Sequence, residues 1–142
     1  MTTKKEKITV QTIVKANLNN VWDSWTKPEH IIHWNFASED WCCPAATNDL
    51  QKGGEFNFRM ESKDGKIGFD FTGIYDKIID EKLITYKMTD GRMVEIHFEQ
   101  NGKEVTVKET FEAEGTNSDE LQRNGWQAIL SNFKRYVESI NN

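Results

Sequence analysis

The sequence has few of the residues that mark specialised classes of protein. Its 142 residues include only two cysteines and two prolines. The cysteines, Cys42 and Cys43, are adjacent and give no framework of disulfide bonds. No apolar run approaches the roughly 18 residues that a membrane-spanning helix requires. Gly-rich phosphate-binding loops and the G-x-S-x-G motif of hydrolases are absent. The sequence therefore excludes a disulfide-stabilised scaffold and offers no familiar enzyme signature.

Positive charge is also scarce. There are 18 Lys and Arg residues against 23 Asp and Glu, a net charge of −5 that argues against binding to nucleic acid. The opening stretch, residues 1–7, is charged and leads into no apolar segment, so no secretory signal is indicated. We therefore expect a cytoplasmic protein. Residues 1–142 have the length of one domain, which can form a core without a disulfide or a metal.

Aromatic residues, in contrast, are abundant, and many of them lie in a region that alternates between apolar and polar residues. Five Trp and eight Phe are present. From Gly54 to Glu112 the alternation predicts five β-strands, and Lys7–Lys15 predicts another before them. Residues 35–52 show no period and are expected to be irregular. Three pairs predict tight hairpin turns in which both central residues have positive φ. The pairs are Asp64-Gly65, Asp90-Gly91 and Asn101-Gly102.

Helices are predicted between the first two strands and at the end of the chain. Residues 19–26 and 28–34 are expected to form two short helices. Residues 118–141 carry apolar side chains at helical spacing, and Gly125 within them suggests a bend or a close approach. The predicted fold class is α+β: a curved six-stranded antiparallel sheet wrapped around the long C-terminal helix. Such a sheet is able to leave a cavity between itself and the helix.

Four segments resemble a known family. They are Val21-Trp22-Asp23-Ser24-Trp25-Thr26-Lys27-Pro28-Glu29-His30 with Trp34, Gly53-Gly54-Glu55-Phe56, Phe71-Thr72-Gly73-Ile74-Tyr75 and Gly125-Trp126. Together they are similar to the START-like, helix-grip superfamily (birch-pollen-allergen-like, SRPBCC). More narrowly, they resemble a single-domain member of the family of homologues of the activator of the heat-shock-protein-90 ATPase. The resemblance covers nearly the whole chain and implies the helix-grip fold.

The resemblance implies three kinds of function. Members of the wider superfamily bind lipids, sterols, plant hormones or polyketides between sheet and helix, and a few are cyclases. The expected function is therefore binding of an apolar or amphipathic small molecule, lipid-like or polyketide-like. One alternative is a module that contacts a chaperone or another protein. The other is a cyclase- or hydrolase-like enzyme that uses a carboxylate in the cavity, although binding is favoured over catalysis.

The residues expected to line the cavity come from the alternating strand faces, the C-terminal helix and the tryptophans near the irregular segment. A filled, dry core would use the same apolar residues, and the sequence leaves both interpretations open. The tryptophans suit the mouth of a pocket, because indole commonly presents its N–H at a boundary. The predicted ligand-binding residues are Trp34, Trp41, Phe58, Phe71, Tyr75, Ile96, Glu109, Trp126 and Leu130.

Glu109 is the most informative of these residues. Counting by twos from Val105 places its carboxyl on an apolar strand face, where it needs a partner, a hydrogen bond or a raised pKa. It would then orient a polar group of the ligand or act as an acid or base, which makes it the one weak catalytic candidate. The alternatives are contact with solvent or an ion pair with Arg92 or Arg59.

A metal site is not indicated. His30 and His33 lie three residues apart, and Cys42 and Cys43 follow closely. Adjacent cysteines do not direct both sulfurs comfortably to one ion, and the spacing of known zinc sites is missing. We expect no metal and no other cofactor.

Overall fold

The structure is a computed structural model that describes residues 6–141; residues 1–5, part of the charged opening stretch, and residue 142 lie outside the described residues. Seven antiparallel strands form one sheet in the order β1-β7-β6-β5-β4-β3-β2. The strands are β1 (Lys7–Val14), β2 (Trp41–Asn48), β3 (Glu55–Ser62), β4 (Gly68–Ile79), β5 (Leu83–Met88), β6 (Met93–Asn101) and β7 (Glu104–Glu112). The helices are α1 (Leu18–Thr26), α2 (Pro28–Ile31) and α3 (Asp119–Ile140).

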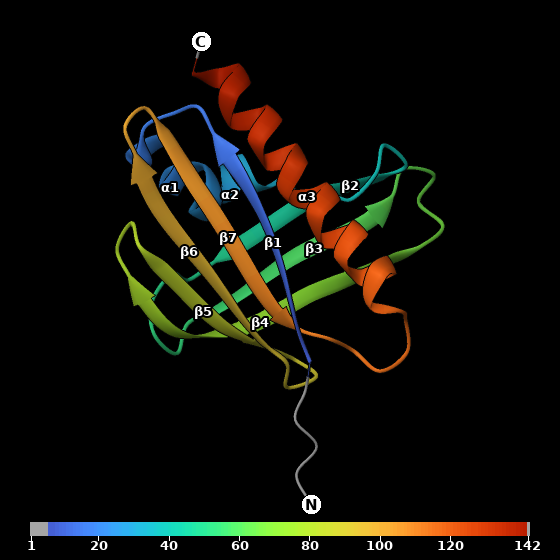
Figure 1. The fold of residues 1–142 in the computed structure, drawn as a ribbon. Coiled ribbons are helices and arrows are strands. Elements are labelled where there is room, and N and C mark those ends of the chain that lie inside the picture. The colour runs from blue at the N-terminus through green and yellow to red at the C-terminus, as the bar shows by residue number, and fades with distance from the viewer. Residues whose placement is uncertain (1–5, 142) are drawn as a thin grey trace, which may run out of the picture.

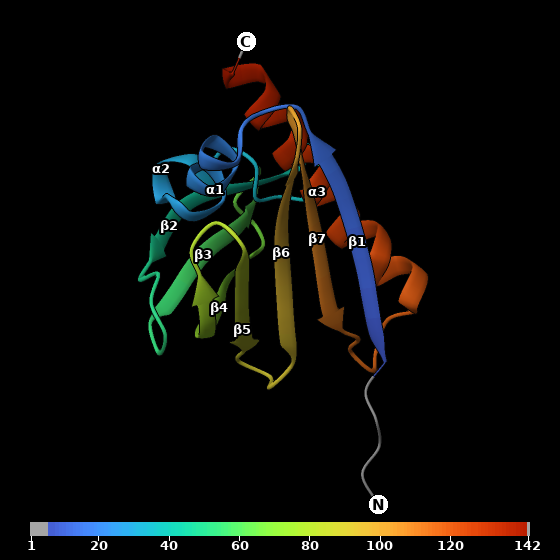
Figure 2. The same cartoon turned by 60° about the vertical axis from the view of Figure 1, so that its left-hand side comes forward.

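The sheet is strongly curled, and α3 lies in its concave side. In Figure 1, β2, β3 and β4 cross behind β1, β7 and β6 at a wide angle, and α3 runs diagonally in front. The helix packs mainly against β1, at one edge of the sheet, while α1 contacts β6 and β7 and α2 contacts β2 (Figure 2). This is the α+β, helix-grip architecture that the sequence predicts.

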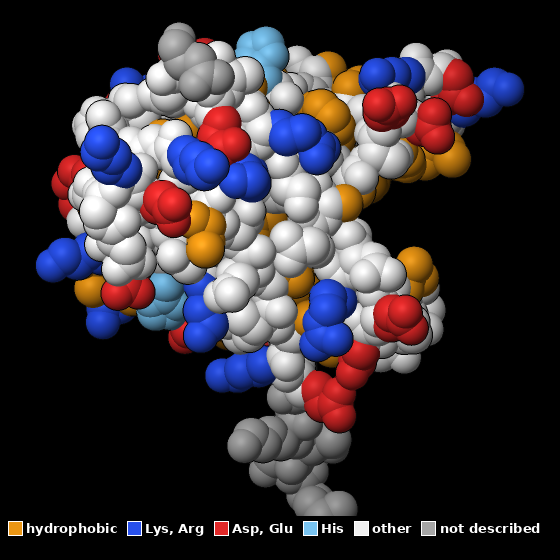
Figure 3. Space-filling view, turned by 45° about the horizontal axis from the view of Figure 1, so that its top comes forward, with side chains coloured by type: hydrophobic (Ala, Val, Ile, Leu, Met, Phe, Trp, Pro, Cys, Tyr) orange, Lys and Arg blue, Asp and Glu red, His pale blue; other side chains and the backbone are white. Residues whose placement is uncertain are grey.

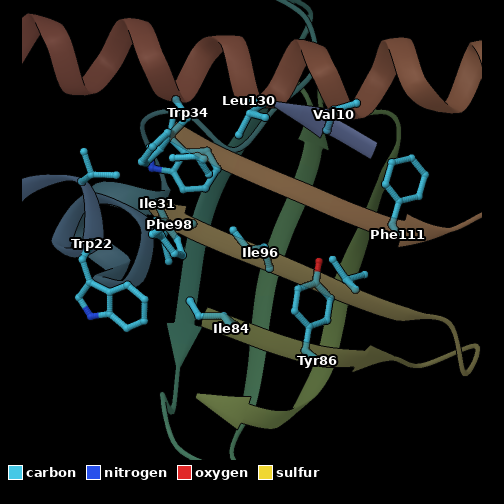
Figure 4. Packing of buried hydrophobic residues seen from close by; sticks show 14 of the residues in the cluster. Val10, Trp22, Ile31, Trp34, Ile84, Tyr86, Ile96, Phe98, Phe111 and Leu130 are labelled. Atoms are coloured by element: carbon cyan, nitrogen blue, oxygen red, sulfur yellow. The ribbon is translucent and has the colours of Figure 1, made fainter. Parts of the chain in front are cut away.

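The apolar pattern explains why these elements pack as they do. In β1, Ile8, Val10 and Val14 are buried, whereas Ile13 points outward. The apolar stripe of α3 meets the same interior through residues such as Leu130 and Phe133, which are fully buried. Figure 4 shows Leu130 between α3 and the strands. The start of α3 is fixed by Ser118, whose hydroxyl accepts a hydrogen bond from the Leu121 N–H at 3.2 Å.

The strand count differs from the prediction of six, because β2 lies in the segment that was expected to be irregular. β2 pairs with β3 at the sheet edge, and its register shifts between Cys42 and Ala45. Pro44 stands inside that shift. A bulge of this kind breaks the alternation of faces, and proline, which lacks an N–H, is tolerated at an edge strand. The alternation that identifies the other strands is therefore missing here.

The three predicted hairpins are present, but the expectation that both central residues have positive φ is wrong. In each of these three pairs only the glycine has positive φ, with values of 76° at Gly65, 92° at Gly91 and 64° at Gly102. In the turn between Asn101 and Glu104, Gly102 holds the first central position, where a type II′ turn needs its one positive φ. The other two glycines lie in longer loops.

Gly73 and Gly125 differ in how much free space surrounds them. A methyl group on Gly73 of β4 would lie 2.6 Å from the ring of Phe56, which is itself buried in the aromatic core. At Gly125 a methyl group would meet no atom within 4 Å, and α3 runs unbroken through this position. The predicted close approach at Gly125 is therefore wrong, whereas Gly73 does allow one.

We predict opposite effects when each glycine is replaced by alanine. Gly73→Ala should lower the free energy of unfolding by about 1–3 kcal/mol, because the added methyl group would lie 2.6 Å from the Phe56 ring and 3.0 Å from the carbonyl oxygen of Lys87, so these groups would have to shift. Gly125→Ala should raise it by about 0.5–1 kcal/mol, because alanine is the better helix former. Urea unfolding of both variants and the wild type measures the two changes. Equal midpoints for the two variants would contradict the packing described here.

Candidate functional site

A cavity of about 370 Å³ lies between the concave face of the sheet and α3. Aromatic side chains from β3, β4 and β5 form one wall, and Trp126 and Ile129 of α3 form part of the other. Arg92, Glu109 and Glu114 are the charged residues in the lining. The cavity exists because α3 packs against β1 and does not reach across to β3 and β4.

The cavity opens between the β3–β4 hairpin and the first half of α3. Met60 and Phe69 reach the lining from the hairpin, and Trp126 and Ile129 reach it from the helix. The space-filling view shows a deep notch on this side of the molecule (Figure 3). Phe69 is 49% exposed at this rim, and Ile67, two residues earlier on the hairpin, is 62% exposed. The entrance is therefore partly apolar.

The aromatic wall is tightly packed. The ring of Phe56 lies 4.7 Å from that of Phe58, 4.8 Å from that of Tyr86 and 5.3 Å from that of Tyr75, measured between centroids. Trp126 stacks on Phe111 of β7 at 4.0 Å. The hydroxyl of Tyr75 donates a hydrogen bond to Asn48 Oδ1 at 2.6 Å. These contacts hold the wall in shape, so the cavity does not depend on loosely placed side chains.

The structure brings six of the nine predicted ligand-binding residues into the lining of this cavity. All six reach it from β3, β4, β7, α3 or the turn after α2. They are Trp34, Phe58, Phe71, Tyr75, Glu109 and Trp126. Their role in binding a ligand stays a prediction.

The other three predicted residues lie outside the lining of this cavity, and their role in binding a ligand also stays a prediction. Ile96 of β6 and Leu130 of α3 are fully buried in the core (Figure 4). Trp41 begins the edge strand β2 and packs on Phe69, with 6.0 Å between the ring centroids. The sequence pattern places Ile96 and Leu130 on interior faces, but it does not show which interior residues α3 covers and which it leaves open to the cavity.

Tyr86 of β5 lines the cavity but was not among the predicted ligand-binding residues. It alternates with Ile84 and Met88, so the same counting by twos that identified Glu109 places it on the interior face. Arg92, which also lines the cavity, lies in the turn before β6 and has no such signal.

Glu109 lies on the concave face of β7, opposite Val10 of β1 and Ile96 of β6. It is 6% exposed, and burial raises the pKa of its carboxyl from 4.5 to about 8. Across residues 6–141 we find no hydrogen bond or ion pair to this carboxyl. The carboxyl therefore faces the cavity without a partner from the protein.

Neither arginine proposed as a partner of Glu109 pairs with it. Arg92 Nε donates to Asp90 Oδ2 at 2.8 Å, and Arg92 Nη1 donates to the carbonyl oxygen of Glu112 at 3.1 Å. Arg59 pairs with Glu61 at 2.9 Å and with Asp70 at 3.6 Å, on the other face of β3. An ion pair between Glu109 and either arginine was thus a wrong expectation.

The histidines and cysteines considered for a metal site are apart from the cavity lining. His30 Nδ1 lies 2.5 Å from the hydroxyl of Tyr136 on α3, and the ring of His33 stacks on the same tyrosine. Cys43 is buried, and burial raises the pKa of its thiol to about 11. Within the described part of the chain, no three His, Cys, Asp or Glu residues are grouped so that they could hold a metal ion.

Comparison with known proteins gives a consistent match. The family described as "Activator of Hsp90 ATPase homolog 1-like protein" matches residues 15–138. The solution structure of the AHSA1-like protein from Aeromonas hydrophila is 39% identical, with a TM-score of 0.90 over 95% of this chain and 94% of that chain. Chr148 from Cytophaga hutchinsonii is 47% identical, with a TM-score of 0.81 over 94% of this chain and 93% of that chain. These matches confirm the resemblance stated from the sequence.

No curated protein matches the chain. None of the helices in the described residues is both long enough and apolar enough to cross a membrane.

We predict that Glu109 makes the stability of the fold depend on pH. Because the folded carboxyl titrates near pH 8 and the unfolded one near its ordinary 4.5, only the folded state holds this proton between those values. The wild type should therefore lose about 1.4 kcal/mol of stability per pH unit as the pH rises through this range. Glu109→Gln, which stays neutral, should remove that loss. Urea unfolding between pH 5 and pH 9 measures the difference.

Glu104→Gln is the matched control, because Glu104 lies on the same strand and is exposed. It should follow the wild-type profile at every pH. Parallel profiles for Glu109→Gln and the wild type would show that the Glu109 carboxyl is paired or solvated in the folded protein.

Proposed function

The chain belongs to the family of Activator of Hsp90 ATPase homolog 1-like proteins, and we propose that it is a small binding protein that takes up an apolar or amphipathic molecule. The ligand would occupy the cavity between the sheet and α3. The observation that carries the proposal is the aromatic-lined cavity of about 370 Å³, which contains the buried, unpartnered carboxyl of Glu109. The free thiols of Cys42 and Cys43 fit our expectation of a reducing cytoplasm.

The size of the cavity supports this proposal. Protein interiors are packed to roughly the density of organic crystals, with few voids larger than a water molecule. Ligand sites commonly measure about 300–1,000 Å³ and combine an apolar lining with a small number of polar groups. A ligand in this cavity would gain about 25 cal/mol for each Å² of apolar surface removed from water. The polar groups would then fix its orientation.

A larger depression, of about 1330 Å³, lies on the opposite face of β3, β4 and β5. Its lining includes exposed or half-buried polar residues such as Asn57, Thr72 and Lys87, and also the exposed Ile74. It has no aromatic wall comparable to that of the interior cavity and holds no buried carboxyl. We therefore propose the interior cavity as the ligand site.

A contact with a chaperone or another protein is the second candidate function. The family description names an activator of the Hsp90 ATPase. The observation that favours such a contact is the exposure of Ile67 and Phe69 on the β3–β4 hairpin, because exposed apolar side chains that cluster mark interaction sites. The two candidates differ in one respect: a surface contact would survive a substitution that fills the cavity.

A catalytic role for Glu109 has less support than a role in binding. A carboxyl whose pKa lies near neutrality suits a general acid or base, and Glu109 has this property. However, among the lining residues that the structure describes there is no Ser, Cys or His beside it. We therefore assign to Glu109 a role in binding.

We predict that filling the cavity abolishes binding without unfolding the protein. Ile129→Trp adds bulk to a lining residue of α3 and should weaken the binding of Nile red, a neutral dye, at least about tenfold. Ile140→Trp is the control, because Ile140 lies at the far end of the same helix and is 48% exposed. It should bind the dye as the wild type does.

Fluorescence titration of the three proteins measures the dye affinity, and thermal unfolding checks that each is folded. Equal binding by Ile129→Trp and the wild type would show that the dye binds elsewhere. A wild type that binds neither Nile red nor other apolar probes saturably would contradict the proposed function.

A further inference from the structure

Two polar groups face the cavity without a partner from the protein. Glu109 on β7 is 6% exposed and Tyr86 on β5 is 8% exposed. In the part of the chain that the structure describes, neither the carboxyl of Glu109 nor the hydroxyl of Tyr86 makes a hydrogen bond. In Figure 4 the hydroxyl of Tyr86 points from β5 into the space beneath α3. Buried hydroxyl and carboxyl groups are normally hydrogen-bonded, so water or a ligand in the cavity would supply the partners of these two groups.

The two groups approach the same part of the cavity. Tyr86 is directly opposite Val94 on β6, and Val94 is directly opposite Phe111, two residues from Glu109 on β7. One strand, β6, therefore separates them, and both side chains line the same cavity. The charge of Glu109 also helps, after burial, to raise the pKa of the Tyr86 phenol.

The other titratable groups of the lining already have partners. The Tyr75 hydroxyl donates to Asn48, and Arg92 is held by Asp90 and by the carbonyl oxygen of Glu112. Glu114 Oε1 accepts a hydrogen bond from the Asn117 N–H at 3.1 Å. Glu109 and Tyr86 are therefore the two titratable groups of the lining that are left for a ligand.

Both groups are hydrogen-bond donors at neutral pH. Burial raises the pKa of Glu109 to about 8 and that of Tyr86 well above its ordinary value, so each keeps its proton. A carboxylic acid that an apolar site keeps neutral donates a hydrogen bond through its O–H. A carbonyl oxygen has two lone pairs and accepts from two donors at once.

We propose that the ligand carries a carbonyl oxygen, and that this oxygen accepts one hydrogen bond from the Glu109 carboxyl and one from the Tyr86 hydroxyl. The aromatic wall would enclose the apolar body of the same molecule. This inference rests on the proposed binding function and adds to it the polar group that the ligand presents.

A cationic ligand fits the same cavity less well. An ammonium group would satisfy an ionised Glu109 but would leave the Tyr86 hydroxyl without an acceptor. The positive charge of Arg92 also acts on Tyr86, where it lowers the pKa of the phenol, and it would repel a cation placed there. The arrangement of charges therefore favours an acceptor oxygen over a cation.

Three probes of similar size test the inference. They are 2-acetylnaphthalene, which carries a ketone; 2-isopropylnaphthalene, its hydrocarbon counterpart; and (2-naphthylmethyl)trimethylammonium, a permanent cation. At pH 6.5 the wild type should bind the ketone about tenfold or more tightly than the hydrocarbon, because each hydrogen bond contributes about threefold to tenfold. This ratio should fall as the pH rises through about 8, where Glu109 loses its proton.

Three variants distinguish the contributions of the two hydrogen-bond donors to ligand affinity. For each variant the affinity for the hydrocarbon serves as the internal reference. Tyr86→Phe should lower the ketone-to-hydrocarbon ratio about threefold to tenfold, because it removes one donor. Glu109→Leu should lower it by a similar factor and make it independent of pH. Glu109→Gln should keep most of the ratio, because its side-chain N–H₂ donates at every pH, but it should also lose the pH dependence.

The outcomes distinguish this inference from the proposed function. Equal binding of ketone and hydrocarbon at every pH would overturn the inference while the cavity remained a binding site. Preference for the cation, with affinity that rises through pH 8, would also overturn it and would assign Glu109 to an ammonium group. If the wild type binds none of the three probes, the proposed function fails together with the inference.

Discussion

One helix cannot cover the concave face of seven strands, and the rest of the structure follows from this mismatch. α3 has 22 residues, which corresponds to about 33 Å, and it packs along β1 at one edge of the sheet. The interior faces of β3, β4 and β5 are therefore left without a helix above them. Their aromatic side chains pack on one another, and the space between them and α3 remains as the cavity.

The position of Glu109 in this arrangement lowers the stability of the folded protein. A carboxyl on the interior face would be stabilised by an arginine, yet Arg59 and Arg92 are held by other carboxylates. Burial instead raises the pKa of the Glu109 carboxyl to about 8, and this lowers the stability of the fold as the pH rises from about 4.5 to about 8. Buried polar groups without partners are costly unless something supplies the missing hydrogen bonds. A ligand with a complementary polar group would supply them, which links the geometry of the sheet to the proposed binding function.

The sequence predicts the parts of this structure that depend on a regular period. Alternation identified the interior face of β1 and the position of Glu109, and helical spacing identified α3. The alternation pattern did not identify β2, because a register shift at Pro44 interrupts it. The sequence also does not separate Ile96 and Leu130, which are buried in the core, from the residues that line the cavity, because the lateral position of α3 on the sheet decides which interior residues are covered. That position depends on contacts between elements far apart in the chain, which no local pattern contains.

The protonation state of Glu109 is the property on which the proposed ligand chemistry depends. Carbon-13 NMR of protein labelled at the glutamate carboxyl carbons measures it directly, with the Glu109 signal assigned by its absence in Glu109→Gln. We expect this signal to titrate with a midpoint near pH 8, far above the ordinary value of 4.5. A midpoint near 4.5 would mean that the carboxyl is solvated or paired, and it would contradict the structure of the site described above.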